Sequence, residues 1–150
     1  MYPWLLALHS LLRWVVILAG LLAVVRGFRG GRWSPADDAA GKWYTISLDV
    51  QMLVGLLLYG IFSPLTYAAF ADMGAAMRDA TLRFYVIEHL TLMVAALALA
   101  HVGKVRIRRA ATDAKKFRTA AIFYGFSLVL VLLATPWPFR EAGRPLFPSF

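Results

Sequence analysis

The chain of 150 residues is 61% hydrophobic and 16% charged, carries a formal net charge of +8 and contains no cysteine. The hydrophobic fraction is well above the roughly 45–50% of soluble domains and indicates a membrane protein. The absence of cysteine excludes disulfides, iron–sulfur clusters, cysteine-ligated zinc and covalent c-type haem attachment. The basic residues lie beside apolar segments, which is a pattern of membrane topology and not of nucleic-acid binding.

Four apolar segments are each long enough to cross a bilayer, which takes about 20 mostly apolar residues. In chain order they cover approximately residues 3–25, 43–62, 82–102 and 119–135. Pro3 suits a helix start, and Pro64 and Pro136 mark helix ends. We expect residues 1–150 to form one all-α integral membrane domain, a four-transmembrane-helix up-down bundle. Residues 136–150 form an extended tail over its surface.

The basic residues concentrate in two of the three connections between these segments. Residues 26–42 and 104–118 hold most of the 16 Lys and Arg residues, whereas residues 63–81 are nearly neutral. The positive-inside rule places the two basic connections in the cytoplasm, which predicts an N-out/C-out topology. The Ala-rich part of the second connection, Thr66 to Met77, is a candidate for a short surface helix.

Two histidines fall at the same predicted depth. His9 lies about six residues into the first segment and His89 about seven residues into the third, so at 1.5 Å per residue both lie roughly 10 Å below the outer surface. Paired imidazoles at one level on facing helices are the ligands of a bis-histidine b-type haem. The alternative is a structural polar cluster without haem.

The helical faces below these histidines become apolar and then small. His9 shares its face with Arg13, Val16 and Gly20, at spacings of four, seven and eleven residues. His89 shares its own with Met93, Ala96 and Ala100 at the same spacings. Small residues admit a flat macrocycle, and they equally admit close helix packing.

The charged and polar neighbours have candidate roles at this site. Glu88 is a candidate partner for Arg13, because neither is tolerated unpaired in lipid, or it orients a histidine. Residues predicted at the outer rim, where haem propionates would point, are Arg83, Arg78, Tyr59 and Ser63.

His101 lies about 18 Å deeper than His89 and cannot share its iron. Its predicted neighbours on the second segment are Asp49, Gln51 and Met52. We weigh a quinone or proton site with Asp49, a second haem on Met52, and an interfacial histidine at a helix end beside Lys104. In the last case Asp49 pairs with Lys42 or Arg26.

Several short motifs are specific enough to suggest a relationship. They are His9-Ser10-Leu11-Leu12-Arg13-Trp14, Thr45-Ile46-Ser47-Leu48-Asp49-Val50-Gln51, Arg83-Phe84, Glu88-His89 and Pro136-Trp137-Pro138. The pattern resembles small four-span bacterial membrane proteins described as cytochrome-b-like, and the resemblance extends over nearly the whole chain. The resemblance implies a protein of the bacterial inner (cytoplasmic) membrane in which His9 and His89 are the haem candidates.

The sequence therefore predicts a membrane electron-transfer protein or subunit with one haem b near the outer, periplasmic face, held by His9 and His89. A single haem part-way through the bilayer implies a quinone or a further redox subunit, in the membrane or the periplasm, as partner. The alternative is a haem-free structural or accessory subunit of a larger membrane complex. No motif of a stand-alone enzyme and no catalytic residue is evident.

Overall fold

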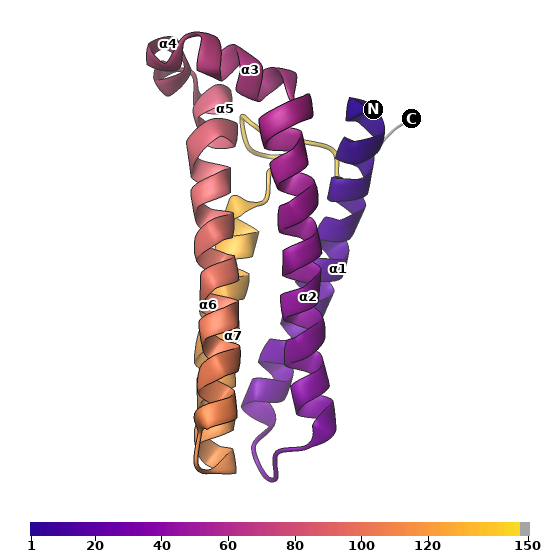
Figure 1. Cartoon of the computed structure of the whole chain (residues 1–150), viewed down its shortest axis with the longest axis vertical. Helices are drawn as coiled ribbons and strands as arrows, with labels where there is room; N and C mark the ends of the chain where they lie inside the picture. Colours follow the sequence, from indigo (N-terminus) through magenta and orange to yellow (C-terminus); the bar gives the residue numbers. More distant parts are fainter. Residues whose placement is uncertain (148–150) are drawn as a thin grey trace.

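The computed structural model describes residues 1–147, and in that part every regular element is helical. Four long helical segments lie side by side, with short helices across one end (Figure 1). Helix α1 covers Tyr2–Arg29. The second segment is α2 (Pro35–Leu57) continued by the π-helical turn η1 (Leu58–Phe62). The third comprises α5 (Ala80–Arg83), the π-helical turn η2 (Phe84–Glu88) and α6 (His89–Arg109). The fourth is α7 (Asp113–Ala134), and the short helices are α3 (Pro64–Ala71) and α4 (Met73–Arg78).

Four of these helical segments are long and apolar enough to cross a membrane, so the chain is a multi-pass membrane protein of the all-helical class. They cover Tyr2–Arg29, Pro35–Phe62, Ala80–Arg109 and Asp113–Ala134. The apolar ranges 3–25, 43–62 and 82–102 lie within these helices, and the range 119–135 overruns α7 by one residue. The N-terminus and the described part of the C-terminal tail lie at one end of the bundle (Figure 1).

The second segment begins eight residues earlier than its apolar pattern suggests, because its first turn is polar. Ser34 and Asp37 form a capping box around Pro35 at the helix start. The Asp37 carboxylate also accepts hydrogen bonds from Arg26, at 3.1 Å, and Arg29, at 2.8 Å. These two arginines end α1, so the carboxylate ties the end of one helix to the start of the next.

Small residues let the helices of the bundle approach closely. A Cβ added at Gly27 of α1 would lie 2.6 Å from the backbone nitrogen of Ala121 in α7. The predicted inward stripes are buried, from Arg13 to Gly20 on α1 and from Met93 to Ala100 on α6. The interhelical hydrogen bonds of the core are few, and they include Tyr44 to Ser127 at 2.8 Å.

The end of the bundle near the chain termini is covered by irregular chain and short helices. The predicted surface helix between the second and third segments is present as α3 and α4. After α7 the described tail has no helix, as its prolines indicate, and it turns back on itself through a hydrogen bond from Arg144 N to Pro136 O at 3.0 Å. The tail thereby reaches α1, and its Leu146 carbonyl accepts hydrogen bonds from Arg13 and Trp14.

Candidate functional site

His9 of α1 and His89 at the start of α6 lie together inside the bundle. Their ring centres are 6.1 Å apart and the ring planes are inclined by 67°. The expectation that two histidines distant in sequence share one level is therefore met. Both line a cavity that encloses about 110 Å³ of free space.

The hydrogen bonding of His89 defines its tautomer and leaves one ring nitrogen free. Its Nδ1 lies 2.7 Å from the backbone oxygen of Ala134, the last residue of α7. A carbonyl oxygen only accepts, so the proton sits on Nδ1 and the Nε2 lone pair is free. This is the outer hydrogen bond that orients most metal-bound histidines in proteins. The π-helical turn η2 immediately precedes His89, and such turns are frequent at functional sites.

His9 is held by the side-chain amide of Gln51. The Gln51 nitrogen lies 3.2 Å from His9 Nε2 and donates to the His9 backbone oxygen at 3.0 Å. Gly55, one turn further along α2, admits the imidazole, because a Cβ there would lie 3.1 Å from His9 Cε1. Gln51, expected beside His101, instead belongs to the His9 site.

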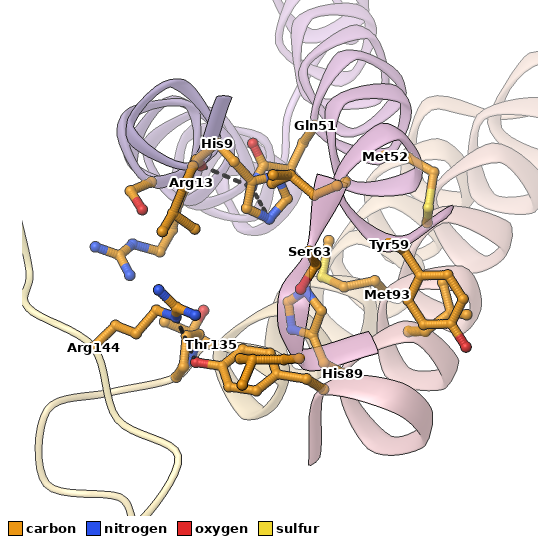
Figure 2. A pocket seen from close by; sticks show the side chains of 18 of the residues that line it. His9, Arg13, Gln51, Met52, Tyr59, Ser63, His89, Met93, Thr135 and Arg144 are labelled. Atoms are coloured by element: carbon orange, nitrogen blue, oxygen red, sulfur yellow. Dashed lines mark hydrogen bonds between the residues drawn. The ribbon is translucent and has the colours of Figure 1, made fainter. Parts of the chain in front are cut away.

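Unpartnered polar atoms concentrate at this cavity. Within residues 1–147, the buried side-chain atoms without a hydrogen-bond partner are His9 Nδ1, Arg13 Nε and Gln51 Oε1. All three residues line the cavity, as Figure 2 shows. Buried polar atoms are satisfied in the large majority of cases, so such a cluster marks a place where a polar ligand group is expected.

Two arginines enter the cavity from the side of the tail (Figure 2). Arg13 is only 7% exposed although it carries a charge. Arg144 of the tail donates from Nε to Tyr85 Oη at 2.8 Å and from Nη2 to Tyr2 Oη at 3.3 Å. Burial alone lowers the pKa of Arg144, but the two phenols outweigh it and raise that pKa above its ordinary value, which keeps the guanidinium charged.

Glu88 pairs neither with Arg13 nor with a histidine, so it takes neither of the two roles considered for it. Its carboxylate accepts from Arg83 Nε at 2.8 Å, and both side chains are about half exposed. Neither residue lines the cavity. Glu88 is the last residue of the π-helical turn η2, and its side chain is exposed instead of facing the cavity. Of the charged groups predicted at the rim, neither Arg83 nor Arg78 lines the cavity, whereas Arg144 of the tail does.

Tyr59 and Ser63 do line the cavity, as expected from their places near the end of the second segment. The Tyr59 hydroxyl donates to the Val86 carbonyl at 3.0 Å, so it joins the two π-helical turns to one another. Arg144 could not be found from the sequence, because no periodicity in the proline-rich tail indicates which residue returns to the bundle.

His101 forms a second, separate polar pair with Asp49. Its Nε2 lies 2.8 Å from the Asp49 carboxylate, and the two side chains are 45% and 49% exposed. Asp49 therefore pairs with His101 and not with Lys42 or Arg26. Met52 and Gln51, expected near His101, line the cavity beside His9.

Within residues 1–147, no three or more His, Asp or Glu side chains gather where they could hold a metal ion. A metal bound between His9 and His89 would have these two as protein ligands, and two is the largest number that the axial positions of an iron porphyrin accept. Comparison with protein-family models, curated proteins and solved structures gave no match to the chain. The fold itself defines the class, an α-helical multi-pass membrane protein with one buried histidine cavity.

Proposed function

We propose that the chain binds one b-type haem between His9 and His89 and acts as a membrane electron-transfer protein or subunit. The observation that carries the proposal is the 6.1 Å separation of the two imidazole ring centres. Two imidazoles bound to opposite sides of one metal, with metal–nitrogen bonds of about 2 Å, place their ring centres roughly 6 Å apart. Histidine is a standard axial ligand of haem iron.

The donor set fits such a group on three counts. The Ala134 carbonyl holds His89 in the tautomer that leaves Nε2 free. The glycine at position 55 lets the His9 ring pack directly against α2. Buried polar atoms of His9, Arg13 and Gln51 have no hydrogen-bond partner and are available to contact a ligand. Ligation through His9 Nε2 requires the Gln51 amide to swing away from it, and a porphyrin requires more space than the present cavity encloses.

Haem, when bound, supplies one-electron exchange, and the chain supplies its setting. His89 is held rigidly by the end of α7, so its ring stays in place during a redox change. Val16 and Met93 contribute apolar walls that exclude water from the cavity. The Arg13 and Arg144 charges favour the reduced, more negative or less positive form of any bound redox group.

The distribution of basic residues supports the orientation of the site. Residues 26–42 and 104–118 hold most of the Lys and Arg residues, so by the positive-inside rule they face the cytoplasm. The termini and the histidine cavity then face the outer side of a bacterial inner membrane. Electrons would pass between quinol in the bilayer and a redox subunit on that side.

The test is an optical spectrum of the purified chain expressed with ample haem, oxidised and then reduced with dithionite. We expect sharp reduced α and Soret bands of a six-coordinate haem, and we expect them to disappear in His89→Ala. A featureless spectrum of the folded wild-type chain would refute the proposal. It would favour the haem-free accessory subunit, which native purification would then reveal in a larger complex.

A further inference from the structure

We infer that Arg13 and Arg144 form a carboxylate-binding site on the tail side of the cavity, so that the cavity takes an amphipathic ligand with an apolar body and a carboxylate arm. For haem, whose propionates supply such arms, the inference rests on the proposed function. The same chemistry would also fit a long-chain fatty acid.

Arg13 is a buried cation without a carboxylate partner in the described residues. It lies one helical turn beyond His9 on α1 and is 7% exposed. Its Nη2 donates to the Leu146 carbonyl, whereas its Nε has no partner. A guanidinium removed from water within a membrane segment normally pairs with an anion, because leaving it unpaired is costly.

Arg144 brings a second positive charge to the same side of the cavity. Its hydrogen-bond acceptors are the phenol oxygens of Tyr85 and Tyr2, which are neutral. Both arginines line the pocket and lie on the side that the tail covers (Figure 2). A carboxylate bound in the pocket would neutralise this positive charge and accept charge-assisted hydrogen bonds from the guanidinium groups.

Three other arginines near the ends of the helices differ from Arg13 and Arg144 because each has a carboxylate partner. Arg26 and Arg29 both bind the Asp37 carboxylate, and Arg83 binds that of Glu88. No carboxylate of residues 1–147 forms an ion pair with Arg13 or Arg144, although both line the cavity. Arg26, Arg29 and Arg83 are thus neutralised by carboxylates of the chain, whereas the two arginines that line the cavity are not.

The position suits a ligand that also reaches the histidines. Arg13 follows His9 by four residues on one helix face, so the two side chains are about 6 Å apart along the axis. A ligand with its body between His9 and His89 therefore places a short acidic arm beside Arg13. Tyr2 and Tyr85 offer further hydroxyls around the same carboxylate.

The experiment compares two ligands that differ only in the acid group, ferric haem and its dimethyl ester. Each is titrated into the full chain in detergent micelles and followed by the Soret band. We expect the wild type to prefer the diacid by about tenfold or more, since hydrogen bonds to charged groups are worth ~1.5–3 kcal/mol. In Arg144→Met that preference collapses, with the ester affinity unchanged. Arg13→Met is expected to act in the same direction.

Arg140→Met is the matched control. Arg140 lies in the same tail, but its guanidinium rests on the Leu133 carbonyl and the Phe84 ring and does not line the cavity. Its loss should leave both affinities unchanged. Equal wild-type affinities for diacid and ester would overturn the inference while leaving haem binding intact. An equal weakening of both ligands in Arg144→Met would also overturn it, because it would mean that Arg144 only holds the tail.

A wild-type chain that binds neither haem nor ester refutes the proposed function but not yet the carboxylate site. Palmitate and methyl palmitate then serve as probes, with the fluorescence of Trp14, which stacks on Phe147 of the tail, as a readout. Saturable binding of palmitate alone, lost in Arg144→Met and kept in Arg140→Met, supports the inference. Absence of that discrimination overturns it.

Discussion

The bundle contains two polar sites built around histidine, and they differ in how completely they are satisfied. At the His101–Asp49 pair the imidazole and the carboxylate contact one another at 2.8 Å, and both side chains are about half exposed. At the His9–His89 cavity three buried atoms have no partner and two arginines have no carboxylate among the described residues. In the first pair the two side chains contact one another, whereas the cavity contains buried polar groups that no described residue of the chain satisfies.

The largest expected effect is the loss of the haem spectrum when a histidine of the cavity is replaced, but not when His101 is replaced. His9→Ala removes one of the proposed axial ligands and should abolish the six-coordinate reduced spectrum. His101→Ala should leave that spectrum unchanged, because His101 is paired with Asp49 outside the cavity. Reduced-minus-oxidised spectra of both variants make the comparison. If only His101→Ala lost these bands, the haem would be assigned to the site at His101 instead.

A smaller effect is expected from filling the space beside His9. In Gly55→Val the added side chain meets the imidazole, since even a Cβ would lie 3.1 Å from Cε1. Overpacking typically costs ~1–3 kcal/mol, so haem affinity should fall by roughly tenfold. Gly125→Val is the control, because a Cβ there has no neighbour within 4 Å. Equal losses in the two variants would indicate a general effect on helix packing.

Removing the amide that occupies His9 should have a modest effect of opposite sign. Gln51→Ala frees His9 Nε2 and deletes an unpartnered oxygen, so haem affinity should rise about threefold, as expected when a competing conformation is removed. Asp49→Ala, on the same helix but outside the cavity, should not change it. A fall in affinity in Gln51→Ala, measured by Soret titration, would show that the amide supports the ligand instead of competing with it.

The smallest effect is expected at the His101–Asp49 pair. Asp49→Asn replaces the carboxylate that contacts His101 by a neutral amide, at a place where both side chains are half exposed. Exposed ion pairs contribute at most about 1 kcal/mol, so the free energy of unfolding in detergent should change by less than that. A loss of several kcal/mol would show that the pair lies in a far less polar environment than its exposure suggests.

The sequence predicts the helices and the meeting of the two histidines because both depend on regular spacing. Apolar length sets the spans, and depth along two helices sets the level of His9 and His89. The partners of the charged residues depend on irregular backbone instead. Glu88 turns to Arg83 at a π-helical turn, and Arg144 arrives on a tail without periodicity. No spacing rule in the sequence anticipates either.

The two π-helical turns have a consequence for the phase of the helices around the cavity. A π-turn accommodates one extra residue, and each residue of an α-helix advances the face by about 100°. The turn η2 therefore rotates everything before Phe84 relative to His89 and the stripe that follows it. It also frees the Val86 carbonyl to accept from Tyr59, whose own segment contains η1. Deleting one residue of η2 would restore a continuous helix, yet it would send Arg83 to another face while His89 kept its place.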